Sequence, residues 1–465
     1  MVGDEKTSSM SEGSVISTKK KIIIGVVVLI CTAVLVVSVF MFSPDPMTID
    51  WSTVQKVPNN VTLLSADDER NSTGATALVK LNEDGTVDES PWKVLQFTDM
   101  HLMQFHDQNA VTMGYFIETI KRERPDFVVL TGDIITRPRG RARAIQLADV
   151  FEKMGIYWCY CLGNHEGDSP PFTLTREENI RIWSKYEHCL VENDVKKTSD
   201  GTAVWGLGNT VVNLLGNGYK VVQSMIFMDS GSKLGYAKDK ETKTLVKELG
   251  LSDDSYDFLR DSQLKWYEEQ VRKVTNNLTN GVKTMLFIHI PLVEMDNVKL
   301  FEATGDPKKS ELPDGWYYAY PDKPLMVGGE VYGYMAVKNG WKLIGDTGSY
   351  EKCYCSSYNS GAYDLMKSLR KGVNALFCGH DHVSNSILYE ESLVGDDPVY
   401  LCYGVCSGLE SYNLFSLGLS DVDDYSLRGY SRIMINADST FDLYHYRYNN
   451  VEHPTLRVLH GVACD

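Results

Sequence analysis

The side chains best suited to chemistry are aspartate, asparagine and histidine residues that directly follow short apolar runs. In α/β sheets, ligands bind at the carboxyl ends of the strands, so these side chains are expected to meet at one rim. Five of the ten histidines of the chain fall in these segments. The segments are Asp99-Met-His101, Gly132-Asp133, Gly163-Asn164-His165-Glu166, His289 and Gly379-His380-Asp381-His382.

The spacing of the segments supports a common rim. Asp99 and Asp133 are 34 positions apart, and Asp133 and Asn164 are 31 apart, each close to the ~30 residues of one βαβ unit. A single residue separates Asp99 from His101, and likewise His380 from His382. In extended chain the two side chains of such a pair point the same way, so each pair can hold one ion from one side.

The mixture of side chains indicates the kind of site. A lone histidine at a strand end is most often structural, but carboxylates, imidazoles and one amide together match two divalent ions that share a bridging carboxylate. Such a pair of ions leaves positions for water and substrate. Because no cysteine is among these segments, we expect Zn, Mn or Fe. The other histidines lack this context and are expected to be surface or core residues: His106, His188, His445, His453 and His460.

The motifs D-x-H, G-D, G-N-H-E, strand-H and G-H-x-H, in this order, resemble the metallophosphoesterase superfamily, the calcineurin-like and purple-acid-phosphatase-like enzymes. The resemblance spans about residues 94–447. Three further pieces, Met228-Asp-Ser-Gly231, Phe287-Ile-His-Ile-Pro-Leu-Val-Glu294 and Leu401-Cys-Tyr-Gly404, look like the non-purple branch. Thr136 stands where purple enzymes carry a metal-bound tyrosine, so neither a purple colour nor an obligatory ferric ion is expected.

The resemblance also implies roles for individual residues. It implies one metal held by Asp99, His101, Asp133 and His382, and a second held by Asp133, Asn164, His289 and His380. His165 would lie beside the leaving group or a phosphoryl oxygen without binding a metal. Glu166 is a candidate to orient His165, and Asp381 is expected to serve the turn between two ligands.

The order of apolar runs and helical stretches predicts the fold class. Strands are expected at residues 94–97, 127–130, 156–162, 211–228, 284–288 and 373–377, and helices near 110–124, 141–154, 257–275 and 363–371. The segment 398–448 is expected to form antiparallel strands. We therefore predict an α/β fold with two packed mixed β-sheets flanked by helices, spanning residues 92–450. Residues 451–465 are expected to be a C-terminal tail. The aromatic-rich insertion at 292–360 is either a lid over the site or a self-packed surface loop.

The N-terminal region predicts membrane attachment. From Ile22 to Phe42 the chain has 21 residues without a charge, and ~20 suffice for a transmembrane helix. Three lysines, residues 19–21, precede the run, which predicts a cytoplasmic N-terminus. We expect residues 1–21 to be a cytoplasmic tail, 22–42 a signal anchor and 43–91 a stalk. A cleaved signal peptide is the alternative, but its apolar run is usually shorter and ends in small residues.

The region after the apolar run is expected to be extracellular or lumenal. Three sequons there are glycosylation candidates, at Asn60, Asn71 and Asn277. Nine of the ten cysteines also lie there, an odd number, so at least one is unpaired within the chain. Disulfides or buried thiols are expected, with no pairing that the sequence alone can assign.

The charge balance narrows the possible partners. The net charge of −16 opposes binding to nucleic acid, whose backbone attracts basic surfaces. A phosphate-ester substrate needs local positive charge, which two bound cations supply. Together with the apolar run, the resemblance implies a membrane-anchored phosphomonoesterase that uses water activated by two metals. The alternatives are a phosphodiesterase acting on nucleotides or phospholipid head groups, and a non-catalytic surface-binding protein stabilised by metal. The oligomeric state is not predicted.

Overall fold

The computed structural model of the chain describes residues 18–42, 49–103, 108–136, 140–168, 174–302, 312–327, 330–344, 350–409, 411, 424–459 and 462–463. It divides into two units, Met1–Pro46 and Met47–Asp465, which are treated separately. Most of the predicted cytoplasmic tail, residues 1–17, lies outside the described residues, as do residues 43–48 and Cys464.

The first unit contains one helix, α1 (Thr18–Phe42), which covers the whole apolar run. Its isoleucine, leucine and valine side chains from Ile22 to Val36 are exposed. Within the described part of the chain, no helix combines the length and apolar character needed to cross a membrane. The predicted transmembrane helix is therefore not confirmed.

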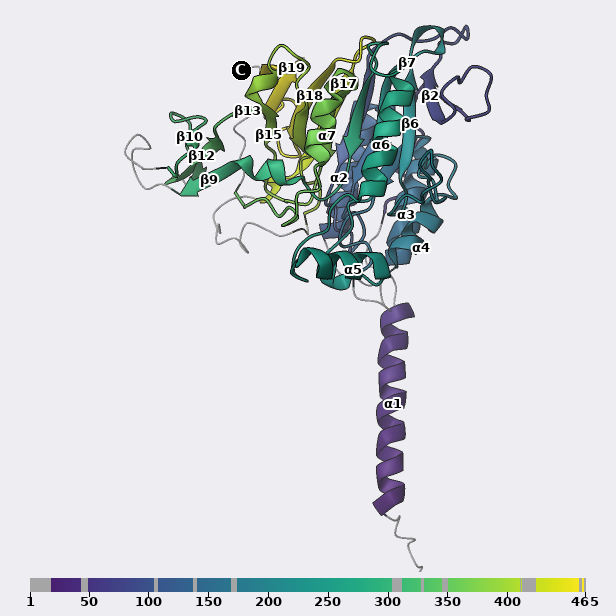
Figure 1. Ribbon diagram of the computed structural model, residues 1–465. Helices are drawn as coiled ribbons and strands as arrows, with labels where there is room; N and C mark the ends of the chain where they lie inside the picture. The colour runs from purple at the N-terminus through teal and green to yellow at the C-terminus, as the bar shows by residue number, and fades with distance from the viewer. Residues whose placement is uncertain are drawn as a thin grey trace, which may run out of the picture. The chain divides into compact units, whose positions relative to one another are not determined.

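The second unit is built on two large mixed sheets (Figure 1). The seven-stranded sheet has the order β20-β19-β18-β17-β3-β4-β5. Its parallel part is the run of three strands predicted from the motif spacing. The strands are β3 (Trp92–Phe97), β4 (Phe127–Thr131), β5 (Trp158–Cys161), β17 (Gly429–Ile435), β18 (Phe441–Arg447), β19 (Leu456–Leu459) and β20 (Val462–Ala463).

The nine-stranded sheet has the order β1-β2-β6-β7-β8-β14-β16-β15-β13. Strands β7, β8, β14 and β16 run parallel at its centre. The strands are β1 (Val61–Leu64), β2 (Thr76–Lys80), β6 (Thr210–Leu215), β7 (Val221–Phe227), β8 (Lys283–Phe287), β13 (Trp341–Ile344), β14 (Val373–Cys378), β15 (Ile387–Glu390) and β16 (Tyr400–Tyr403).

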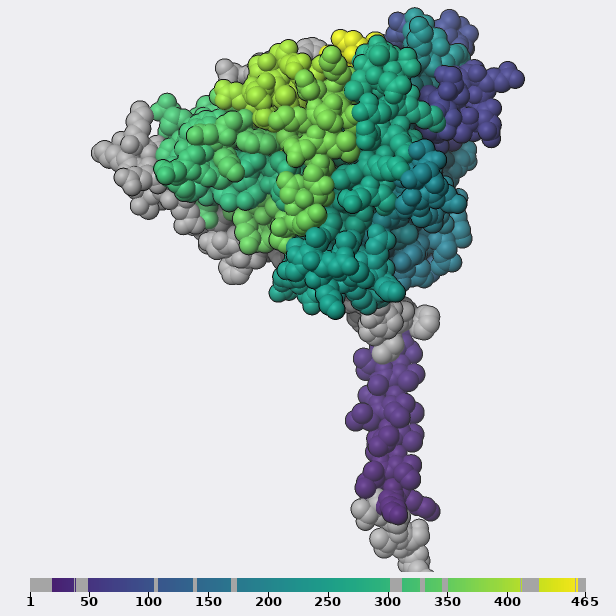
Figure 2. Space-filling view, viewed as in Figure 1, coloured from purple at the N-terminus to yellow at the C-terminus, as the bar shows by residue number. Residues whose placement is uncertain are grey.

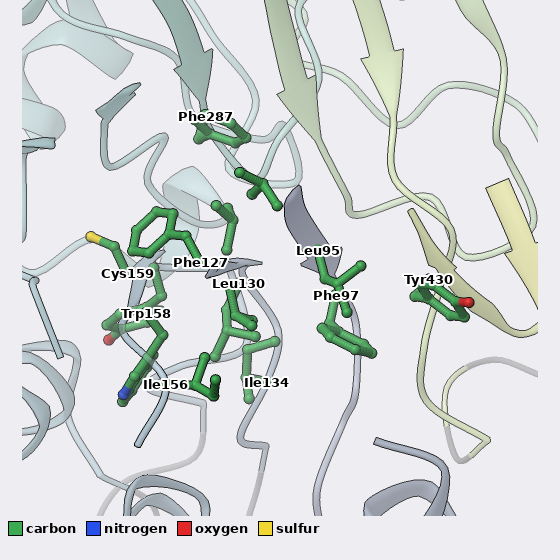
Figure 3. Close-up of a cluster of buried hydrophobic side chains, with 14 of the residues drawn as sticks. Leu95, Phe97, Phe127, Leu130, Ile134, Ile156, Trp158, Cys159, Phe287 and Tyr430 are labelled. Atoms are coloured by element: carbon green, nitrogen blue, oxygen red, sulfur yellow. The ribbon is translucent and has the colours of Figure 1, made fainter. Parts of the chain in front are cut away.

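The two sheets pack face to face through alternating apolar side chains. Phe287 stacks between Phe227 and Phe377, with ring centroids 5.0 and 5.2 Å apart, and all three belong to the same buried cluster as Phe127. Figure 3 shows Phe287 and the side chains of the opposite sheet. Since side chains alternate along a strand, the neighbours Leu286 and Leu376 face away, into a second buried cluster.

Helices cover the outer faces of both sheets. The first cluster includes apolar residues of α2 (Gln108–Glu123) and α3 (Gly140–Met154), and the ring of Phe116 in α2 lies 4.8 Å from that of Phe97 in β3. The second includes residues of α6 (Asp261–Val274) and α7 (Ala362–Ser368). Two shorter helices, α4 (Arg176–Trp183) and α5 (Lys240–Leu249), follow β5 and β7. The predicted α/β fold with mixed sheets flanked by helices is confirmed.

The insertion at 292–360 has structure of its own. It forms a four-stranded sheet from β9 (Val298–Glu302), β10 (Trp316–Tyr318), β11 (Leu325–Val327) and β12 (Glu330–Lys338), coloured green in Figure 2. Its last strand, β13, joins the nine-stranded sheet through β15. Residues 303–311, 328–329 and 345–349 of the insertion lie outside the described residues.

Three expected segments are arranged differently. Residues 43–91, expected to be a stalk, contribute β1 and β2 to the edge of the nine-stranded sheet. Residues 451–465, expected to be a tail, contribute β19 and β20 to the other sheet. In the segment 398–448, β16 pairs in parallel with β14 instead of forming only antiparallel contacts. In each case a short strand pairs with a strand outside its own segment, which local sequence does not reveal.

Candidate metal centre

The five motif segments follow the carboxyl ends of β3, β4, β5, β8 and β14. Asp99, Asp133, His289 and His380 each come two residues after the end of a strand, and Asn164 comes three after β5. Because β3, β4 and β5 are mutually parallel, as are β8 and β14, these ends lie at common rims. A hydrogen bond from the backbone N–H of His380 to Asp99 Oδ2, 3.0 Å long, joins the two sheets there.

The backbone is unusual at the aspartates and histidines of this rim. Asp99, His101, Asp133 and His380 all have positive φ, at 52°, 47°, 51° and 80°. Non-glycine residues in this region are uncommon, and such strain is concentrated at functional sites. At Gly163 a Cβ atom would overlap the backbone and carboxylate of Asp133. The chain is thus packed closely around Asp133.

One group of possible ligands consists of Asp99, His101, Asp133 and His382, with one donor atom from each lying within 4.8 Å of the others. The Nε2 atoms of His101 and His382 are 3.1 Å apart. His382 Nε2 lies 3.3 Å from Asp99 Oδ1, and His101 Nε2 lies 3.7 Å from Asp133 Oδ2. All four residues are buried.

A second group consists of Asp133, His289 and His380. His289 Nε2 lies 3.2 Å from Asp133 Oδ2 and 3.3 Å from His380 Nδ1. Asn164 completes it, with Oδ1 at 3.0 Å from His289 Nε2. Asp133 belongs to both groups, so its carboxylate has the position of a bridge. The structure therefore brings together all seven residues predicted from the sequence.

The donor set fits divalent cations. Among the described residues, the buried oxygens Asp99 Oδ1 and Asp133 Oδ2 have no hydrogen-bond partner, although a buried carboxylate oxygen is costly to leave unpaired. Burial holds the pKa of His101 and His380 well below its usual range, so both imidazoles are neutral and able to bind a metal. Unpaired anionic oxygens close to imidazole nitrogens are what a cation requires.

Other contacts fix the orientation of the possible ligands. His289 Nδ1 lies 2.7 Å from the carbonyl oxygen of Thr131, which leaves Nε2 to face Asp133. The hydroxyl of Thr98 donates to Asp99 Oδ2 at 2.7 Å, which leaves Oδ1 to face His382. Contacts of this kind set the tautomer and direction of metal-binding side chains.

Glu166 has a different position from the one expected. Its carboxylate accepts hydrogen bonds from the backbone N–H groups of Asp133, Ile134, Ile135 and Gly163, at 2.6 to 3.3 Å. It therefore joins the loop after β4 to the loop after β5. Burial, reinforced by the charge of Asp133, raises the pKa of Glu166 to about 7.

His165 is paired with Asp168, a residue that the sequence analysis did not single out. His165 Nδ1 contacts Asp168 Oδ2, and its Nε2 lies 3.9 Å from Asp133 Oδ2. Burial works to lower the pKa of His165, but the charges of Asp133 and Asp168 outweigh it and raise the pKa to about 9. Its side chain is 22% exposed, whereas that of His289 is fully buried. In the sequence, the only sign of this pairing is that a carboxylate stands three residues after the histidine of the G-N-H motif.

Asp381 is buried between the two possible ligands His380 and His382. It accepts a hydrogen bond from the hydroxyl of Tyr403 at 2.5 Å and from the backbone N–H of Tyr354 at 3.3 Å. It therefore ties the loop after β14 to residues of the insertion and to β16. Asp381 was expected to stabilise the turn between the two ligands. The structure adds these long-range contacts, which no sequence pattern predicted.

Comparison with known proteins agrees with the motifs and the geometry. Residues 93–384 match the family model described as Calcineurin-like phosphoesterase. No curated protein matches the chain.

Three solved structures are similar to it at low identity. They are a dimetal phosphatase from Danio rerio (11% identity, TM-score 0.41, covering 76% of this chain and 95% of that one), GAP50, the anchor in the inner membrane complex of Plasmodium (12%, 0.41, 78% and 88%), and TT1561 of Thermus thermophilus (7%, 0.34, 77% and 100%).

Proposed function

Because the chain belongs to the calcineurin-like phosphoesterase family, we propose that it is a hydrolase of phosphate monoesters that requires two divalent metal ions. The observation that carries the proposal is the position of Asp133, which belongs to both groups of possible ligands and has a buried, unpaired Oδ2 among the described residues. Asp99, His101, Asp133 and His382 would hold one ion, and Asp133, Asn164, His289 and His380 the other. Zn, Mn and Fe all suit these donors.

When bound, two such ions supply Lewis acidity to a phosphoryl oxygen and lower the pKa of water. The residues of the chain provide the arrangement. Four buried side chains converge on each ion position, and Glu166 fixes the two loops that carry Asp133 and Asn164. Such a preformed arrangement avoids reorganisation during the reaction.

His165 is our candidate proton donor. With a pKa of about 9 it carries a proton at neutral pH, and Asp168 holds its Nδ1 so that Nε2 points toward the centre. A proton donated from Nε2 to the leaving oxygen would neutralise the charge that develops when the ester bond breaks. The imidazolium would also steady a phosphoryl oxygen.

Membrane attachment is part of the proposal and depends on the sequence of residues 22–42 alone. The run of 21 uncharged residues after three lysines supports a signal anchor with the catalytic domain outside the cytoplasm. Carbonate extraction and protease protection of the full chain in membranes test it. Release by carbonate, or protection of the N-terminus instead of the domain, would contradict it.

The activity is tested with the purified protein, metal analysis and two substrates. We expect two equivalents of metal and faster hydrolysis of p-nitrophenyl phosphate than of its bis ester. Asp133→Asn and His380→Ala should lose metal and turnover while remaining folded, and His453→Ala, an exposed histidine, should behave as wild type. Preference for the bis ester would indicate a phosphodiesterase, and two bound metals without hydrolysis of any ester would indicate a binding protein.

A further inference from the structure

Residues 350–358, here called the strap, cross over the loop that carries His380 and His382. The backbone N–H of Tyr350 donates to the carbonyl of Val383 at 3.2 Å, and the N–H of Val383 donates to Glu351 Oε1 at 2.7 Å. Further along the strap, the N–H of Tyr354 donates to Asp381. Both Asp381 and Val383, in the loop at residues 380–383, are therefore hydrogen-bonded to the strap.

The strap also contacts the segment around Tyr256, a residue that packs against His380. Ser356 pairs with Tyr256, and the hydroxyls of Ser255 and Ser357 lie 2.7 Å apart. The ring of Tyr256 meets that of His380 edge to face, with centroids 4.4 Å apart.

The strap carries two cysteines on either side of Tyr354. Cys353 and Cys355 are both free and half-buried, and each thiol shifts the pKa of the other. Tyr403, whose hydroxyl binds Asp381, also lies 3.3 Å from Cys353 Sγ. The other described cysteines of this unit are buried: Cys159, Cys161, Cys189, Cys378, Cys402 and Cys406. The pair in the strap is thus the most accessible to a small oxidant among them.

We propose that Cys353 and Cys355 form a reversible disulfide, and that its formation loosens the loop at residues 380–383. One thiolate attacks a low-molecular-weight disulfide and releases one thiol. The second thiolate then attacks the mixed disulfide, releases the other thiol and closes the bond. Overall, two protein thiols become one disulfide, and the small disulfide gains two electrons and two protons.

The pKa shifts of the two thiols indicate which cysteine attacks the small disulfide first. The neighbouring thiol of Cys353 lowers the pKa of Cys355, whereas the thiol of Cys355 and burial raise the pKa of Cys353. Cys355 therefore reacts first and Cys353 resolves the mixed disulfide, because the thiolate is the nucleophile. A disulfide that closes so short a ring is strained, and this strain makes it more easily reduced.

Closing the ring changes the contacts that hold the ligand loop. The peptide between the two cysteines bears the N–H that Tyr354 donates to Asp381, and it must turn when the sulfur atoms are joined. Oxidation also removes the thiol of Cys353 that lies 3.3 Å from the hydroxyl of Tyr403. Both contacts meet at Asp381, between His380 and His382. The disulfide does not depend on the proposed function, whereas its consequence for hydrolysis does.

The disulfide is tested on the full-length protein in glutathione buffers of graded redox state, quenched by alkylation and mapped by peptide mass. We expect Cys353 and Cys355 to lose alkylation together, with a mass lower by two hydrogens, and to recover on reduction. A synthetic peptide of residues 350–358 in the same buffers is the reference. It shows the redox state at which the two cysteines form a disulfide when the fold does not constrain them. If both protein thiols remain alkylatable where the peptide has closed, the inference is overturned.

The coupling is tested by hydrogen exchange, which needs no bound metal and no activity. Exchange at the Val383 N–H should be about tenfold faster in the oxidised protein, the factor expected for loss of one hydrogen bond. Cys353→Ser and Cys355→Ser should each abolish the redox dependence, and Ser357→Ala, on the same strap, should retain it. Equal exchange in both redox states overturns the coupling. Redox-dependent exchange in a protein that hydrolyses no ester would refute the proposed function instead.

Discussion

The carboxylate of Glu166 accepts a hydrogen bond from the backbone N–H of Asp133, with 3.0 Å between Oε2 and the nitrogen. The same oxygen accepts from the N–H of Gly163 at 2.7 Å. Glu166 thus holds in place the residue shared by both groups of possible ligands, although it belongs to neither group. The positive φ of Asp133 is maintained by these bonds rather than by local preference.

We predict that Glu166→Gln destabilises the protein and weakens metal binding. The amide would direct a donor at one or more backbone N–H groups, and a buried donor left unpaired costs about 1–3 kcal/mol. Urea denaturation should show a loss of about that size, and the affinity for added Zn²⁺ should fall by about 10- to 100-fold. Glu268→Gln, on the exposed face of α6, is the control. Wild-type metal affinity in Glu166→Gln would contradict the role given to Glu166.

Asp168→Asn is predicted to shift the alkaline limb of the pH–rate profile. The pKa of His165 is raised to about 9 in part by Asp168, so loss of this charge lowers it, by about 1 unit or more. If protonated His165 donates to the leaving oxygen, kcat declines as pH rises through this pKa, and the decline begins at lower pH in the variant. Asp149→Asn, which alters a carboxylate bonded to Tyr186, should leave the profile unchanged. An identical profile in Asp168→Asn would exclude His165 as the donor.

The sequence could place these side chains at one rim because each motif follows a strand directly. Two βαβ spacings and two histidine segments were enough to place seven side chains around one point, since parallel strand ends converge whatever the intervening residues are. The helices α2 and α3 and the central strands were predicted for a different reason, because the apolar pattern of each is strong over its own length.

The parts that were missed depend on contacts between distant residues. Nothing in the sequence near Glu166 shows that it binds the loop after β4, 31 to 33 positions earlier. Tyr256 reaches His380 only because the strap and the segment after α5 are paired. The strands β1 and β2 were missed because Gly, Asn and Asp residues surround them and obscure any apolar alternation.

Among the three sequons, we predict that Asn277 is glycosylated and Asn71 is not. Asn277 is exposed, whereas Asn71 is buried and its amide donates to the carbonyls of Ser65 and Ala75 at 2.8 and 2.7 Å. A glycan would break this packing. In a secretory host, Asn277→Gln should remove mass that a glycosidase also removes, and Asn71→Gln should leave the glycan mass unchanged. Absence of any glycan would also argue against the proposed lumenal or extracellular position of the domain.

His445 should make the protein sensitive to acid. Burial, with a smaller contribution from Arg447, lowers its pKa to about 3, and neither ring nitrogen has a hydrogen-bond partner among the described residues. Between pH 6.5 and about 3 the unfolded chain binds a proton at this residue and the folded chain does not. The free energy of unfolding therefore falls as pH drops below 6.5, by about 2 kcal/mol at pH 5 from this residue alone.

Replacing His445 with leucine should remove this part of the pH dependence. Leucine has a similar volume and no ionisable group, so in urea denaturation His445→Leu should lose about 2 kcal/mol less than wild type between pH 7 and pH 5. His453→Leu, at an exposed position, should follow wild type. Equal losses in His445→Leu and wild type would mean that the folded protein accepts a proton at His445. Such a proton would require the two sheets to open around β18, since no partner in the described part of the chain stands ready to receive it.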